Sequence, residues 1–226
     1  MVKELTEIAT NHYQKTFEIT YEFWKERNRL FVYLVLTIGV GLLLLLRVPE
    51  VSLLLVDAVA KLLGITDANR INQLYKDFPI DVLLSIFVVI TFYLMQRLYS
   101  TNLSVSRDYL YLGAIEVEIR KHLALPEESI LFTREGKFYW GQRTITQTMS
   151  KWYYILVIFI VLLPFLILKI IADINSGNFL LVIIDSIIAI MTLVFFAGYA
   201  RSAINFDIPI FLSLAQKAKT KSTPKK

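Results

Sequence analysis

The chain has 226 residues, of which 56% are hydrophobic, and it carries a formal net charge of +5 and no cysteine. Without cysteine it forms neither disulfides nor thiolate metal sites, and with only two histidines we expect no metal centre. A chain of this length has room for a membrane bundle and one small polar element, and we expect no second globular domain.

The hydrophobic residues are concentrated in four long runs, at 30–46, 80–98, 153–171 and 179–199. A helix of about 20 apolar residues crosses the roughly 30 Å of hydrocarbon in a bilayer. The sequence therefore predicts an all-α membrane protein with four transmembrane helices, an N-terminal amphipathic helix and a small cytosolic segment made of a helix and a β-hairpin.

The runs divide the chain into five predicted parts. These are a cytosolic amphipathic helix (1–29), a first transmembrane pair with an amphipathic extracytoplasmic loop (30–98), a cytosolic helix and hairpin (99–151), a second transmembrane hairpin (152–200) and a basic cytosolic tail (201–226). The first 15 residues are polar and charged, so we expect no cleavable signal peptide.

Apolar and aromatic residues recur every fourth position in the N-terminal segment: Leu5, Ala9, Tyr13, Phe17 and Tyr21. This spacing predicts a helix that lies on the membrane or on the bundle, and the alternative is an oligomerisation helix. It runs into the first span, where two small residues, Gly39 and Gly41, permit a close helix contact.

The first loop contains an apolar stripe from Val51 to Leu62 that is too short to cross a bilayer, and it ends at Gly64. We expect this helix at the membrane interface or as a cap on the bundle. The second span continues past the membrane as a helix that Pro126 stops, and a predicted turn at 172–178 joins the third and fourth spans.

Residues 126–151 differ in composition from the rest of the chain, with β-forming residues on both sides of a turn at 134–137. Cations and aromatic residues gather around this turn. They suit a phosphate or nucleotide ligand or a partner protein, and the alternative is a hairpin on the membrane surface with interfacial aromatic side chains. The residues of this candidate surface are Arg134, Lys137, Tyr139, Trp140 and Arg143.

Positive charge is distributed unevenly between the two sides of the predicted membrane. Of the 24 Lys and Arg residues, five lie before the first span, eight in the second loop with its edges, six in the tail and only five on the other side. The positive-inside rule then predicts a multi-pass inner-membrane protein with both termini in the cytoplasm. The basic side indicates anionic lipid headgroups as partners.

Known catalytic patterns are absent from the sequence. It contains no Walker loop, no Gly-x-Ser-x-Gly elbow, no His-Glu-x-x-His pair and no dinucleotide fingerprint. We expect no enzyme, no cofactor and no module for direct nucleic-acid binding.

Asp185 is the most informative single residue, because a carboxylate inside a span costs about 2.5–3.5 kcal/mol on insertion scales. One interpretation is structural: Asp185 pairs with Lys169 of the preceding span or bonds to hydroxyls such as those of Ser186 and Thr192. The other places Asp185 in a pore or an oligomer interface.

The N-terminal half resembles a style of bacterial membrane effector. The resemblance is carried by the aromatic helix 21–29 that runs into a span and by the helix 109–120 that continues a second span into the cytosol. This pattern is similar to SLATT-type effectors and to small four-span proteins associated with CBASS and CRISPR anti-phage defence. The resemblance implies pore formation or membrane disruption after a signal from a soluble defence partner or a nucleotide.

We therefore expect a homo-oligomeric inner-membrane effector of the abortive-infection type that forms a pore or perturbs the membrane. Control would come through the cytosolic segment 99–151. The alternatives are a non-conducting scaffold or regulatory subunit for a soluble partner, and a small-solute transporter, although no internal repeat supports the latter.

Overall fold

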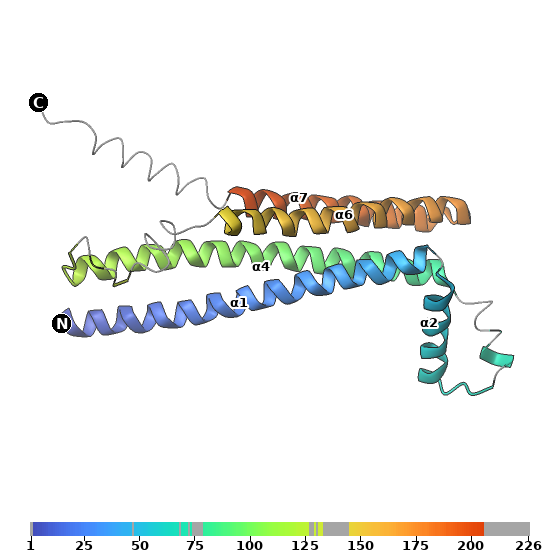
Figure 1. Ribbon diagram of the computed structural model, residues 1–226, viewed down its shortest axis with the longest axis horizontal. Helices are drawn as coiled ribbons and strands as arrows, with labels where there is room; N and C mark the ends of the chain where they lie inside the picture. Colours follow the sequence, from blue (N-terminus) through green and yellow to red (C-terminus); the bar gives the residue numbers. More distant parts are fainter. Residues whose placement is uncertain are drawn as a thin grey trace, which may run out of the picture. The chain divides into compact units, whose positions relative to one another are not determined.

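The computed structural model describes the chain from residue 2 to 205 apart from 47, 68, 72, 74–78, 127, 128, 130 and 133–144. Helix is the only regular secondary structure in this part of the chain, in agreement with the predicted all-α class. The helices are α1 (Val2–Leu45), α2 (Pro49–Leu62), α4 (Ile80–His122), α6 (Ile145–Ser176) and α7 (Phe179–Asn205) (Figure 1).

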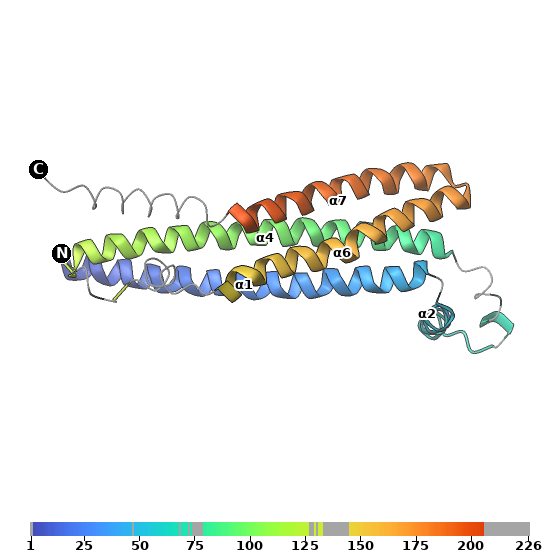
Figure 2. The ribbon, with the colours of Figure 1, turned by 45° about the horizontal axis from the view of Figure 1, so that its top comes forward.

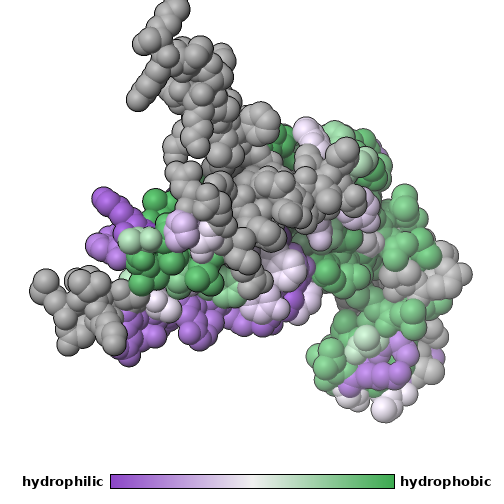
Figure 3. Space-filling model, turned by 60° about the vertical axis from the view of Figure 1, so that its left-hand side comes forward, coloured by the Kyte–Doolittle hydropathy of each residue, from purple (hydrophilic) through white to green (hydrophobic). Residues whose placement is uncertain are grey.

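Four of these helices are long and apolar enough to cross a membrane: Glu7–Leu45, Ile80–His122, Trp152–Ser176 and Phe179–Ile204. In the most apolar window of each, only 17–28% of the residues are buried inside the protein. Figure 3 shows the result as broad hydrophobic areas, in green, on the face it presents. Apolar surface left outside on this scale marks a membrane-facing protein, which confirms the predicted four spans in length and composition.

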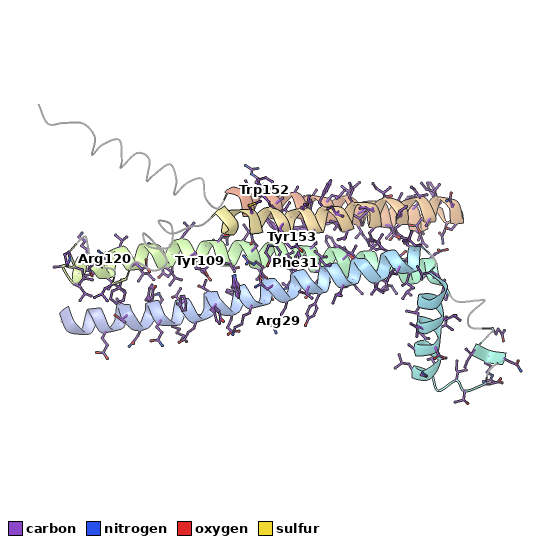
Figure 4. The ribbon with its side chains drawn as sticks, in the orientation of Figure 1. Arg29, Phe31, Tyr109, Arg120, Trp152 and Tyr153 are labelled. Atoms are coloured by element: carbon purple, nitrogen blue, oxygen red, sulfur yellow. The ribbon has the colours of Figure 1, made fainter. Side chains whose placement is uncertain are left out.

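The described residues form two compact units, and the long helices contribute to both. The first unit comprises the described residues of 2–29, 98–155 and 196–205, and the second comprises the described residues of 30–97 and 156–195. Along α1 the division falls between the labelled residues Arg29 and Phe31 in Figure 4, where the sequence changes from charged to apolar.

In the first unit, α1 packs against α4. The Tyr13 hydroxyl donates a hydrogen bond to Glu116 Oε1 at 2.9 Å, and His12 Nε2 lies 2.9 Å from the Tyr111 hydroxyl. The apolar stripe of α4 in this unit is buried at its centre and exposed at its end, because Leu112 and Ile119 are 0% and 1% exposed and Leu123 is 38% exposed. In this unit α1 therefore packs along α4, and its relation to a membrane or to a second copy stays a prediction.

The buried face of α1 differs from the predicted stripe. Ala9, Tyr13 and Phe17 of the predicted stripe are partly buried, whereas Tyr21 is exposed. The inward side chains follow alternating spacings of three and four residues. Tyr21 instead stacks on Trp24, and Lys25 Nζ lies 4.4 Å above the Tyr21 ring. The inward face is formed by Tyr13, Thr16, Thr20, Phe23, Arg27 and Leu30.

In the second unit, α6 and α7 lie side by side and so do α1 and α4, in both ribbon views (Figures 1 and 2). Gly41 of α1 meets α6 closely, because a Cβ at this position would be 2.6 Å from the Phe165 ring. The close helix contact suggested by the glycines therefore occurs at Gly41, whereas a Cβ on Gly39 would meet nothing within 4 Å.

The amphipathic helix of the first loop is α2, which turns across the direction of α1 (Figure 1). Val56 and Ala60 are buried, while Leu54 and Leu62 are 70% and 86% exposed. The helix ends before Gly64, which adopts a φ of +69° as predicted for a terminating glycine. Its position at a membrane interface stays a prediction.

Two predicted boundaries need correction. Residues 172–176, assigned to a turn, are the last turn of α6, and only Gly177 and Asn178 separate it from α7. Residues 126–151 were predicted to have β character, but α6 already begins at Ile145. The turn at 134–137 lies outside the described residues.

Candidate functional site: a buried charge cluster

Three helices bring four polar side chains together inside the second unit. We call Ser85 of α4, Lys169 and Asp173 of α6, and Asp185 of α7 the charge cluster. Gly177, with a φ of +74°, reverses the chain within two residues, so α7 returns directly along α6. Because Lys169 and Asp173 are four residues apart on one helix, they lie on the same face.

Lys169 is the centre of the charge cluster. Its Nζ donates to Asp185 Oδ2 at 2.7 Å across the helix pair and to Asp173 Oδ1 within α6. The same Asp185 Oδ2 is 2.7 Å from the Ser85 hydroxyl, which donates to it from α4. One ammonium group and one hydroxyl thus connect three helices through the single carboxylate of Asp185.

The three charged members of the charge cluster are buried, whereas Ser85 is partly exposed. The Lys169, Asp173 and Asp185 side chains are each 1% exposed. Two of its carboxylate oxygens, Asp173 Oδ2 and Asp185 Oδ1, are buried without a hydrogen-bond partner among the described residues. With one cation against two carboxylates, the fully ionised cluster would carry a net charge of −1 in an apolar environment.

The structure brings together the two charged residues that the sequence analysis singled out in the spans. The Lys169–Asp185 pair of the structural interpretation is present. The hydroxyls suggested with it do not contribute: Thr192 is buried but donates to the Ile188 carbonyl of its own helix at 2.7 Å. Within the described residues Ser186 makes no hydrogen bond to the charge cluster.

Sequence reasoning missed two members of the charge cluster. Asp173 was counted among turn formers, although its spacing from Lys169 is that of a helical ion pair. Ser85 is a polar residue in the apolar run of the second span, and one serine in a span is too common a feature to single out. Its partner Asp185 is 100 residues away, so only the fold identifies the contact.

The second candidate surface lies outside the described residues: Arg134, Lys137, Tyr139, Trp140 and Arg143. The part of segment 99–151 that precedes it is held by Arg120, near the end of α4 in Figure 4. The Arg120 guanidinium donates to the carbonyls of Pro126, Ser129 and Leu131 at 3.0, 2.7 and 2.6 Å.

The first unit has a polar contact of its own. Asn102 of α4, which is 5% exposed, donates to the Ser202 hydroxyl of α7 at 2.9 Å and receives a long hydrogen bond of 3.5 Å from Arg27 of α1. These neutral and cationic groups satisfy one another, as buried polar groups usually do. The charge cluster differs from this contact because it gathers an excess of negative charge.

Within the described residues no group of three or more His, Cys, Asp or Glu side chains is placed to hold a metal ion.

The fold and the charge cluster together define an all-helical protein with four candidate membrane spans and a buried ionic centre between three of its helices. No protein family, no curated protein and no solved structure matches this chain.

Proposed function

We propose that this chain is a homo-oligomeric effector of the inner membrane that makes the bilayer permeable to ions. Both termini and the segment 99–151 would lie in the cytoplasm, where the segment would receive the signal of a soluble partner or a nucleotide. The single observation that carries the proposal is the charge cluster, because ionised side chains inside membrane spans are costly and usually serve ion pathways or binding.

The burial of the charge cluster constrains how such a pathway would work. Asp185 is 1% exposed and bonded to Lys169 and Ser85 of its own chain, so it does not line a resting pore in this conformation. Permeation would then require that α6 and α7 separate at the charge cluster and expose its carboxylates. The resting state would be closed.

Assembly from several copies follows from size and surface. Four spans of one chain hardly enclose a wide path, so the copies would surround an axis. The apolar side chains of α7 are largely outside, which leaves that helix free to contact lipid or a second copy. They include Phe179 (75% exposed), Leu180 (65%), Ile190 (62%) and Val194 (63%). The resemblance to defence effectors agrees with an assembly triggered by infection.

A second function is favoured by the closed geometry of the charge cluster. A network that ties α4, α6 and α7 together within one chain also suits a rigid, non-conducting scaffold that anchors a soluble partner. The two functions differ in one respect, because a scaffold passes no ions even when its partner is present.

The deciding experiment is the membrane potential of bacteria after induced expression, followed with a depolarisation dye. Asp185→Leu and Asp185→Asn are the test variants, and Asp57→Asn, which removes an exposed carboxylate of α2, is the matched control. A conducting effector predicts depolarisation by wild type and by the control, and an altered response in both Asp185 variants at equal protein levels. Unchanged permeability and unchanged oligomer size in both would overturn the proposal.

A further inference from the structure

We propose that the charge cluster binds one proton, which Asp173 and Asp185 share, so that the cluster is neutral with Lys169 charged. The inference rests on the proposed function only for the placement of these helices in a membrane. It holds whether or not the protein conducts ions.

The first argument is charge balance. A net charge of −1 in a low-dielectric interior is costly, and a proton on one carboxylate removes it. Among the described residues of the unit, no other titratable group supplies the missing positive charge, and Arg70 is exposed. On α2, Lys61 already pairs with Asp57 at 3.3 Å and is exposed. On α4, Arg97 is twelve residues beyond Ser85, which is about 18 Å along a helix.

The neighbouring helices add no cation near the charge cluster. Asp81, one turn before Ser85 on α4, is itself acidic, and its backbone carbonyl lies 3.1 Å from the Ser85 hydroxyl. The buried face of α1 in this unit is apolar, with Leu34, Ile38 and Leu44 at 0–1% exposure. On α7, Asp185 is the only acidic or basic residue from Phe179 to Phe195.

The second argument comes from hydrogen bonding. Lys169 Nζ donates to both carboxylates, so the two carboxyl groups lie around a single nitrogen atom. Asp173 Oδ2 and Asp185 Oδ1 are buried acceptors with no donor among the described residues. Ionised carboxylates offer acceptors only, whereas a protonated one gains a donor. One added proton therefore supplies the group that this site lacks.

The α6–α7 turn is the end of the helix pair nearest to the charge cluster. Asp173 is four residues before Gly177, which corresponds to about 6 Å along α6 from the α6–α7 turn. Uptake from hydronium forms one O–H bond on a carboxylate oxygen and leaves one water molecule, with no electron transfer. The charge distribution predicts that this turn lies on the extracytoplasmic side of the membrane.

Infrared spectroscopy of the purified full-length protein in lipid nanodiscs tests the inference directly. The carbonyl stretch of a protonated carboxyl group is separate from the bands of carboxylates. At neutral pH we expect one such band in wild type, its loss in Asp173→Asn and in Asp185→Asn, and a second protonated carboxyl in Lys169→Met. Asp57→Asn, which removes an exposed carboxylate, is expected to keep the wild-type band.

Ser85→Ala provides a variant that retains every titratable group. Because it removes the hydroxyl that donates to Asp185, it is expected to keep the band and shift its frequency. The inference is overturned if wild type shows no band, if both Asp variants retain it, or if Ser85→Ala leaves its position unchanged. Disappearance of the band when sodium chloride replaces choline chloride would also overturn it, since the occupant would then be Na⁺. None of these readouts requires ion conduction.

Discussion

Lys169 is the residue on which the buried ionic centre depends, because within the described part of the chain it is the only cation bonded to the two carboxylates there. Removing one member of a buried ion pair usually destabilises a protein by about 3–5 kcal/mol, since the remaining charge is left without compensation or is neutralised by a proton at a cost in free energy. Exposed ion pairs contribute far less, at roughly 0–1 kcal/mol. The two kinds of pair occur in the same unit of this chain.

Lys169→Met is therefore expected to lower the free energy of unfolding by about 3–5 kcal/mol, measured as denaturant or thermal unfolding in detergent micelles. The matched control is Lys61→Met, which breaks the exposed Asp57–Lys61 pair and is expected to cost less than about 1 kcal/mol. Similar losses in the two variants would contradict the central position of Lys169.

Gly41 and Gly39 form a second matched pair at the residue scale. A methyl group at Gly41 would stand 2.6 Å from the Phe165 ring, so Gly41→Ala is expected to destabilise by about 1–3 kcal/mol through overpacking. Gly39→Ala meets nothing within 4 Å and is expected to stabilise α1 by up to about 1 kcal/mol. Unfolding of the two variants under one set of conditions checks the opposite signs.

At the scale of single elements, Arg120 fixes the chain that follows α4. Its three hydrogen bonds to carbonyls need the planar guanidinium, which a lysine does not replace. Arg120→Lys is expected to lower the free energy of local opening of this segment by about 1.5 kcal/mol. This corresponds to a roughly tenfold gain in the rate of chymotryptic cleavage after Leu131 and Phe132. Lys121→Ala, at the exposed neighbouring position, is the control. An equal gain in cleavage rate in this variant would contradict the role of Arg120 in holding the segment.

The helices were predictable from the sequence because their causes are local. The long apolar runs, the terminating Gly64 and the continuation of α4 beyond its apolar run are all visible in the residues themselves. The buried face of α1 was not predictable in the same way. Each step of four residues turns by 400° around the helix axis, so a stripe with this spacing drifts by about 40° at each step. Over the four steps from Leu5 to Tyr21 this drift carries the stripe to another face. Packing against α4 selects the alternating spacing instead.

The candidate site was predictable in part, for a related physical reason. An isolated charge in an apolar run stands out, so Lys169 and Asp185 were found. Asp173 was hidden because aspartate, asparagine, serine and glycine also favour turns, and its pairing with Lys169 holds it in the helix. Ser85 joins through a contact 100 residues apart, which no local pattern contains.

At the scale of the whole molecule, the charge distribution predicts orientation. The absence of cysteine allows a direct test with single introduced cysteines and a membrane-impermeant maleimide. Asp67→Cys, exposed after α2, is expected to react in intact bacteria, whereas Asn11→Cys, exposed on α1, is expected to react only after the inner membrane is permeabilised. The reverse pattern would place the basic side outside and refute the predicted topology.

The pairing of Lys169 with Asp173 within one turn of α6 also bears on how the protein is made. The pair can form as soon as α6 leaves the ribosome, so this helix can enter the bilayer with its cation already neutralised. In α7, Asp185 has its partners on α4 and α6, and its entry alone costs about 2.5–3.5 kcal/mol. The last two helices are thus expected to enter the translocon as a pair, because α6 supplies the cation that pairs with Asp185 of α7.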